Sequence, residues 1–193
     1  MPLENTMIHL IGSPGAGKYT IARALVAKTG ARLIDNHSIA NVIFNVLNVD
    51  GITPLPPSVW VRVGRVRAAV FDAITNLSPP AMSFVFTNYI RGDDPADVAV
   101  FEELLALAAK RGAAYVPVLL SCETPELLRR IVQPDRAARM KLIDPVEGAR
   151  INDEIPPFET DHANVLRLDV TALAPDAAAA TTIAWAERCA AAQ

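Results

Sequence analysis

The sequence MIHLIGSPGAGKYTIARALVAKTG, residues 7–30, decides the fold of this 193-residue chain. A short apolar run at 7–11 is typical of a buried strand, and a glycine-rich turn at 12–18 follows it at once. Apolar residues then recur at helical spacing: Ile21, Ala22, Leu25 and Val26. A strand, a glycine-rich turn ending in lysine, and a helix form the context in which such a turn binds phosphate.

The turn has the chemistry that a phosphate-binding loop needs. Its glycines let the backbone close around an anion with amide groups pointing inward, and the following helix adds the positive end of its dipole. A lysine in the first helical turn opposes that dipole, and an anionic ligand removes the conflict. The alternative is a strand-to-helix turn without a ligand. We expect phosphate binding by Gly12, Ser13, Pro14, Gly15, Ala16, Gly17 and Lys18.

The residue after the lysine departs from the usual pattern GxxxxGK[ST], in which a short hydroxyl coordinates Mg²⁺. Tyr19 stands at that position, and Thr20 follows it. A phenol on a long rigid side chain cannot place its oxygen where a serine Oγ lies, and Thr20 lies about 100° further around the helix. The sequence therefore predicts phosphate binding without direct coordination of the metal by the loop.

Length and composition favour a single domain, residues 1–193, with one substantial core. The net charge of −3 gives no electrostatic reason to expect binding to nucleic acid or to an anionic membrane. The longest apolar run, 113–120, is too short to span a bilayer and contains Pro117. Two cysteines and an N-terminus without a cationic apolar leader indicate a cytoplasmic protein.

Apolar segments of strand type alternate with amphipathic segments of helix type, including a long helix from Ser58 and a terminal helix at 175–192. Runs such as SFVF and VPVLL are typical of a parallel sheet covered by helices on both faces. Ligands of such sheets bind beyond the carboxyl ends of the strands. The residues that follow each strand are therefore candidate site residues, with strands expected at 7–11, 31–34, 83–87, 115–120 and 164–168.

Asp35 ends the second strand and should lie at the same sheet edge as the phosphate loop. Its carboxylate could accept a proton from an attacking hydroxyl or hold Mg²⁺ through water. The alternative is a cap for the helix that begins near Ser38. His37 is a candidate for bonding an acceptor substrate, and an ordinary polar residue at a helix start is the alternative.

After the third strand, the position where many phosphate-loop proteins keep an acidic metal ligand holds Asn88, which can orient substrate or water. Arg62 and Arg65 lie three residues apart on the predicted long helix, opposite its valine face. These two arginines could bind an acidic substrate, and a solvated helix face is the alternative.

Residues 129–141 hold five cations although the chain as a whole is acidic: Arg129, Arg130, Arg136, Arg139 and Lys141. Phosphoryl transfer spreads negative charge over the moving group, and guanidinium groups on a mobile segment stabilise that charge. Arg136 and Arg139 share one face if the segment is helical. The alternative is a basic surface helix.

The loop GSPGAGK resembles the GxPGxGK loop of small nucleotide-dependent kinases, such as adenylate, shikimate and gluconate kinases and the chloramphenicol phosphotransferases. The order of elements resembles theirs over nearly the whole chain. The resemblance implies a three-layer α/β/α fold with five parallel strands in the order 2-3-1-4-5 and an arginine-bearing helical lid at about 124–156. Tyr19 departs from the family pattern.

The resemblance also implies roles for individual residues. Lys18 would bridge the outer phosphates, and Thr20 would contact the α-phosphate. Asp35 matches the position of an aspartate that shikimate-kinase-like enzymes keep near the acceptor hydroxyl. Two arginine pairs complete the implied site: Arg129 or Arg130 stacking on adenine, and Arg136 and Arg139 reaching the transferring phosphate.

These observations predict a kinase that uses ATP and Mg²⁺ to phosphorylate a hydroxyl of a small acceptor, as a monomer or homodimer. A nucleotide-binding protein or switch with weak NTPase activity and no transfer is the alternative, because Tyr19 replaces the metal-binding hydroxyl. The expected site residues fall into three groups: Lys18, Asp35, Arg136 and Arg139 for catalysis, the loop with Tyr19, Thr20, Arg129 and Arg130 for ATP, and His37, Arg62, Arg65 and Asn88 for the acceptor. Asp35 is also expected to hold the metal through water.

Overall fold

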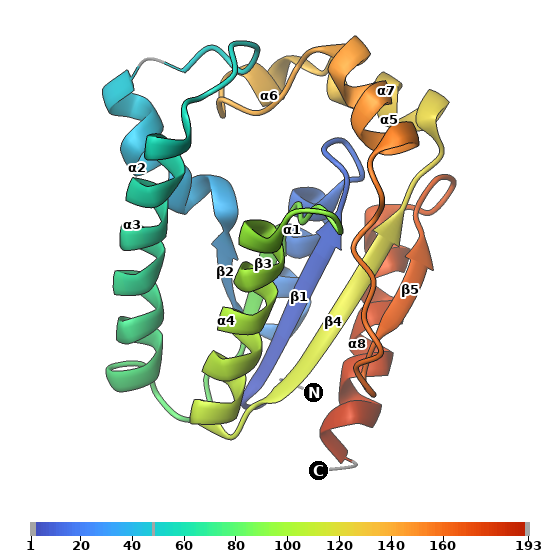
Figure 1. The fold of residues 1–193 in the computed structure, drawn as a ribbon. Helices are drawn as coiled ribbons and strands as arrows, with labels where there is room; N and C mark the ends of the chain where they lie inside the picture. Colours follow the sequence, from blue (N-terminus) through green and yellow to red (C-terminus); the bar gives the residue numbers. More distant parts are fainter. Residues whose placement is uncertain (1–2, 48, 192–193) are drawn as a thin grey trace.

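Five strands form one sheet in a computed structural model that describes residues 3–47 and 49–191 (Figure 1). The strand order is β2-β3-β1-β4-β5, and every pair of neighbours is parallel. The fold class and the strand order expected from the sequence are therefore confirmed. The strands are β1 (Thr6–Gly12), β2 (Arg32–Asp35), β3 (Phe84–Asn88), β4 (Ala114–Ser121) and β5 (Leu166–Asp169).

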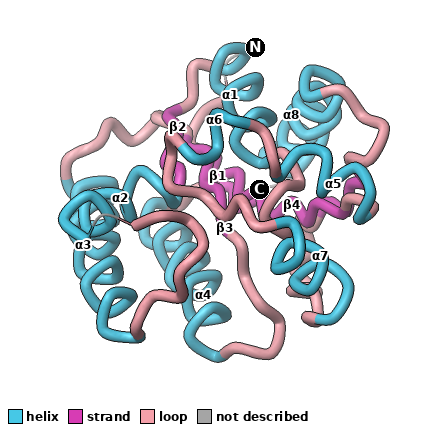
Figure 2. Tube along the Cα trace, turned by 90° about the horizontal axis from the view of Figure 1, so that it is seen from above, coloured by secondary structure: helices cyan, strands magenta, loops and turns pink. Residues whose placement is uncertain are grey.

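Helices cover both faces of the sheet, with α1 and α8 on one side and α3 and α4 on the other (Figure 2). The helices that build these layers and the cleft are α1 (Lys18–Thr29), α2 (Asn36–Leu47), α3 (Pro57–Asn76), α4 (Pro95–Arg111) and α8 (Pro175–Ala191). The long helix begins one residue before the predicted Ser58, and the fifth strand begins at Leu166 rather than at 164. Residue 192, the predicted end of the last helix, lies outside the described residues.

The inner strands are buried on both faces, which explains their continuous apolar runs. On β1, Ile8 and Leu10 pack with α1 and α8, whereas Met7 and Ile11 pack with α3 and α4. The outer strands β2 and β5 are short, with four residues each. Among the described residues, no helix combines the length and apolar character that crossing a bilayer requires.

The segment 124–156, the predicted lid, forms short helices that pass above the carboxyl ends of the strands (Figure 1). They are α5 (Thr124–Ile131), α6 (Pro134–Ala137) and α7 (Pro145–Glu154). Residues 129–141 do not form one helix, so Arg136 and Arg139 do not share a helical face. Pro134 disfavours helical backbone at the preceding residue, and Met140 has a left-handed φ of 52°.

Arg111, at the end of α4, holds the end of α3 and the turn after it. Its guanidinium group donates to the carbonyl of Ile74 at 2.5 Å and to the hydroxyl of Ser78 at 2.7 Å. The same group donates to the carbonyls of Pro79 and Pro80 at 3.0 and 3.2 Å. These bonds tie the end of α4 to the last turn of α3 and to the turn that follows it.

Replacing Arg111 by leucine should lower the free energy of unfolding by about 3 kcal/mol, because several partly buried acceptors lose a charged donor. Urea denaturation followed by circular dichroism measures this change. Lys110→Leu, the exposed neighbour on α4, is the control and should change stability by less than about 0.5 kcal/mol. Equal effects of the two substitutions would show that Arg111 does not stabilise this corner.

Candidate phosphate-binding site

The phosphate loop closes tightly because its glycines adopt conformations that other residues avoid. Gly15 and Gly17 have φ values of 98° and 91°, in the left-handed region. A Cβ at Gly12 would come within 2.6 Å of the Leu120 carbonyl oxygen on β4. The loop is therefore a compact turn between β1 and α1, and Gly17 precedes the first residue of that helix.

Lys18 begins α1 and bends back into the loop. Its ammonium group donates to the carbonyl of Gly12 at 2.6 Å and to that of Ser13 at 3.0 Å. Burial, with the positive charges of Lys141 and Arg136, lowers the pKa of Lys18 from 10.5 to about 7, against the opposing effect of Asp35. A phosphate group at this position would offset the same unfavourable burial.

Asp35 lies at the carboxyl end of β2 and is buried. Its Oδ1 accepts a hydrogen bond of 2.5 Å from the hydroxyl of Thr87 on β3, and its Oδ2 lies 3.8 Å from the Lys141 ammonium. Among the described residues, no amide of α2 donates to this carboxylate, so the capping alternative gains no support. The aspartate is thus held at the sheet edge beside the phosphate loop.

Three cations lie near one another at this carboxylate, because Lys18 feels the charges of Lys141, Arg136 and Asp35. Arg136 is fixed by its own segment, because its guanidinium donates to the Leu142 carbonyl at 3.1 and 2.9 Å. Burial lowers the pKa values of both Arg136 and Lys141. We call these three cations together with Asp35 the cation cluster. Asp135 also acts on Arg136 and Lys141, so the cations outnumber the nearby carboxylates by one, and a polyanion would neutralise the remaining positive charge.

His37 and Asn41 lie one turn apart on α2, beside the cation cluster. Burial and the nearby charge of Lys141 lower the pKa of His37 from 6.5 to about 4, so the imidazole is neutral at pH 7. Within the described part of the chain, His37 Nδ1 and Asn41 Oδ1 are buried and have no hydrogen-bond partner. Both atoms are therefore available to a polar ligand, and Asn41 was not singled out by its sequence context.

Three of the predicted acceptor-binding side chains lie outside the cation cluster. Arg62 and Arg65 are exposed on α3, and Arg62 donates to the carbonyl of Ser58 in its own helix at 2.7 Å. Asn88 is buried, and its Oδ1 lies 3.0 Å from Nε2 of His9 in the interior. Arg62 and Arg65 therefore lie on an exposed helix face, and Asn88 lies in the interior against His9.

The predicted ATP-binding arginines differ from each other. Both pair with Glu126, but Arg129 is exposed, whereas Arg130 also donates to the carbonyl of Ala16 in the phosphate loop at 3.3 Å. Arg130 also donates to the carbonyls of Val170 and Thr171 after β5. Arg130 therefore ties the loop to the base of the lid segment.

Lys141 and Thr87 are the site residues whose importance the sequence did not reveal. Lys141 was one cation of a basic stretch, and Thr87 was one residue at the end of a strand. Their contact with Asp35 depends on the turn after α6 and on the pairing of β2 with β3. Neither arrangement has a local sequence pattern.

The side chains near the phosphate loop decide whether the protein itself could hold the metal ion that phosphoryl transfer needs. Among residues 3–47 and 49–191, no group of three or more histidine, cysteine, aspartate or glutamate side chains could hold a metal ion. Magnesium in kinases keeps several waters and is bound by substrate phosphates and one or two carboxylates. Asp35 fits that role through water, so the residues suit an ion that arrives with the nucleotide.

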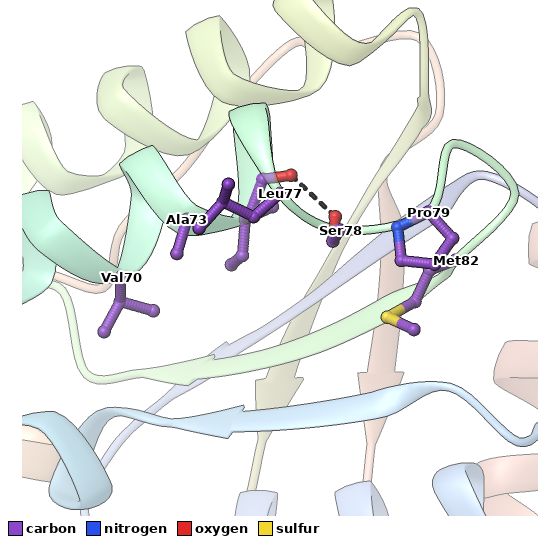
Figure 3. A pocket seen from close by; sticks show the side chains of 7 residues that line it. Val70, Ala73, Leu77, Ser78, Pro79 and Met82 are labelled. Atoms are coloured by element: carbon purple, nitrogen blue, oxygen red, sulfur yellow. Dashed lines mark hydrogen bonds between the residues drawn. The ribbon is translucent and has the colours of Figure 1, made fainter.

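An apolar surface hollow lies elsewhere, at the end of α3 (Figure 3). It is lined by Val70, Ala73, Ile74, Leu77, Ser78, Pro79 and Met82, and its volume is about 370 Å³. Met82 precedes β3, so this hollow lies at the amino end of that strand, opposite the phosphate loop. Its lining carries no charged side chain to bind phosphate.

Comparison with solved structures identifies the class of fold. No family model matches the sequence, and no curated protein matches it closely enough to count as a relative. A gluconokinase from Sinorhizobium meliloti 1021 superposes with a TM-score of 0.64 at 15% identity, over 100% of this chain and 97% of that chain.

Two further structures show the same likeness. A sugar kinase from Janibacter sp. HTCC2649 matches with a TM-score of 0.64 at 14% identity, over 95% of each chain. A candidate kinase from Chloroflexus aurantiacus J-10-fl matches with a TM-score of 0.66 at 18% identity, over 93% of this chain and 97% of that chain. The chain therefore has the fold of the P-loop kinases.

The lowered pKa of Lys18 predicts proton uptake when a phosphate chain binds. Negative charge beside the ammonium group raises its pKa, so between pH 7 and 10.5 the bound form holds a proton that the free form lacks. Affinity for ATP should therefore fall as the pH rises above 7. At pH 8, calorimetry in buffers of different ionisation enthalpy should detect about one proton taken up through Lys18.

Lys18→Arg is the control for this measurement, because a guanidinium stays protonated at every accessible pH. Its proton uptake at pH 8 should be lower than that of the unmodified protein by about one proton. Identical uptake by both proteins would mean that Lys18 is already charged in the free form.

Proposed function

We propose that this protein is an ATP-dependent phosphotransferase that moves the γ-phosphate of ATP to a hydroxyl group of a small molecule. The observation that carries the proposal is the cation cluster beside the phosphate loop, in which Lys18 lies near Arg136, Lys141 and Asp35. Partly buried cations in excess of carboxylates favour a polyanionic ligand. The kinase fold of the structural neighbours supports the same reading.

In the proposed reaction, the acceptor oxygen forms a bond to the γ-phosphorus while the bond from that phosphorus to the bridging oxygen of ADP breaks. The proton of the acceptor hydroxyl passes to the Asp35 carboxylate. Lys18 binds the outer phosphates, and Arg136 and Arg139 neutralise the charge that spreads over the moving group. The hydrogen bond from Thr87 keeps the carboxylate oriented.

Magnesium bound with ATP would neutralise charge on the β- and γ-phosphates. His37 and Asn41 supply unpartnered polar atoms on α2, the helix that directly follows Asp35. A polar acceptor would satisfy these atoms, which otherwise stay buried without partners. Gluconate and other sugars come first among the acceptors to test, because two structural neighbours are named for them.

The experiment is ATP turnover with and without Mg²⁺ over a panel of hydroxyl-bearing metabolites, with the product identified by mass spectrometry. One acceptor should raise ADP formation at least tenfold and gain one phosphate group. A nucleotide-binding protein with weak NTPase activity is the second candidate, favoured by Tyr19 at the metal-binding position. Tight ATP binding without transfer to any acceptor would support that candidate and contradict the kinase.

A further inference from the structure

The aromatic ring of Tyr19 contacts two cations of the lid segment. The guanidinium carbon of Arg139 lies 4.0 Å from the ring centroid, and the ammonium nitrogen of Lys141 lies 4.5 Å from it. Both distances are within the range of cation–π attraction, in which the negative face of the ring binds a positive group. The residue that departs from the phosphate-loop pattern therefore has a defined set of contacts.

Arg139 and Lys141 come from one turn, and the backbone of that turn adopts a conformation that residues other than glycine rarely adopt. Met140, between them, has a φ of 52°, in the left-handed region. Its side chain packs against the apolar cluster of α2 and α3, which includes Ile39 and Phe44. Packing on one side and the Tyr19 ring on the other hold the turn in place.

The turn also contacts the loop between α2 and α3. A Cβ added at Gly51 would lie 2.6 Å from the Lys141 carbonyl oxygen, so the backbone at Gly51 packs directly against the backbone at Lys141. Residues 139–141 thus lie between the phosphate-loop helix and the α2–α3 hairpin. This is where the lid segment meets the parts of the chain on both sides of the cleft.

The charges around the turn explain why it needs an aromatic partner. Lys141 is repelled by Arg136 and Arg139, and Lys18 by Lys141 and Arg136, while Asp35 and Asp135 are the carboxylates that oppose this repulsion at Lys141. The ring supplies a further electron-rich surface without adding a charge that would repel phosphate. A serine at position 19 would contact neither cation through a ring face.

We infer that Tyr19 is a positioning residue that holds Arg139 and Lys141 over the phosphate loop. The structural part of this inference, that Tyr19 holds the turn, rests on the contacts alone. Its catalytic consequence rests also on the proposed function. The ring face carries the effect, because the Tyr19 hydroxyl is engaged elsewhere, accepting a hydrogen bond of 3.4 Å from Arg23. Phenylalanine keeps the face, and leucine keeps apolar bulk without it.

The structural test compares Tyr19→Leu with Tyr19→Phe by limited trypsin digestion without nucleotide. Cleavage after Arg139 and Lys141 should be faster by about tenfold in Tyr19→Leu, and Tyr19→Phe should stay within about twofold of the unmodified protein. Cleavage after Lys110, on α4, should proceed at the same rate in all three proteins and shows that the fold is intact. Equal cleavage after residues 139 and 141 in the two variants would overturn the inference.

The kinetic test separates this inference from the proposed function. With an acceptor identified, Tyr19→Leu should lower kcat by about tenfold with less change in the KM for ATP, and Tyr19→Phe should recover most of the loss. If the unmodified protein transferred no phosphate but Tyr19→Leu were still cleaved faster, the positioning role of Tyr19 would be supported and the proposed kinase function would be refuted. Equal kcat values for Tyr19→Leu and Tyr19→Phe would remove the catalytic consequence of the ring.

Discussion

Replacing Lys18 by alanine should weaken ATP binding by about 100-fold, because a charged donor to the phosphates is lost from a site with little water. Turnover should fall with it. The measurements are the Kd for ATP by calorimetry and the rate of ADP formation. The free energy of unfolding should not fall, since burying the Lys18 ammonium group is itself unfavourable and lowers its pKa.

Lys28→Ala is the matched control for this substitution. Lys28 lies at the other end of α1, is exposed, and pairs with Asp176 on α8 at 3.1 Å. Its removal should leave the Kd for ATP within about twofold, since exposed ion pairs contribute little. If Lys18→Ala bound ATP as well as Lys28→Ala does, the phosphate-loop assignment would be refuted, and the kinase proposal with it.

Asp35→Asn should lower kcat by about 1,000-fold while changing the Kd for ATP by less than about threefold. The amide has the shape of the carboxylate and can still accept the hydrogen bond from Thr87, but it cannot take the proton of the acceptor hydroxyl. Single-turnover transfer to the identified acceptor, together with calorimetric ATP binding, measures both quantities. The size of the loss reflects general base catalysis.

Asp169→Asn is the control, because Asp169 ends β5 at the same edge of the sheet and is exposed. It should retain full activity. A fall in ATP affinity as large as the fall in kcat would assign Asp35 to nucleotide or metal binding instead of proton transfer. Unchanged activity of Asp35→Asn would remove Asp35 from the mechanism.

The sequence predicted the sheet because local patterns and the global fold agree there. Apolar runs, glycines and helical periodicity can each be recognised within a short stretch of sequence. The positive φ values at Gly15 and Gly17 show why the loop has glycine at these two positions. The phosphate loop and Asp35 could be placed at one edge by the rule for parallel strands. The strand order came from resemblance to known kinases rather than from these patterns.

The surroundings of the site could not be predicted because they depend on tertiary contacts. The segment 129–141 leaves the helical conformation at 132–133 and turns at Met140, and that turn directs Lys141 to Asp35 and Tyr19. Asn88 was expected in the cleft, but its partner His9 lies on β1, and that pairing arises only when the strands come together. Side-chain direction at these positions has no signal along the chain.

The brevity of β2 and β5 has a consequence for how the chain meets its neighbours in solution. An outer strand exposes a row of unpaired peptide groups that another chain can extend, and four residues offer few of them. Each carries an exposed arginine, Arg32 and Arg167, which further opposes the approach of a hydrophobic strand. Intermolecular extension of the sheet, a route to aggregation, is thereby disfavoured.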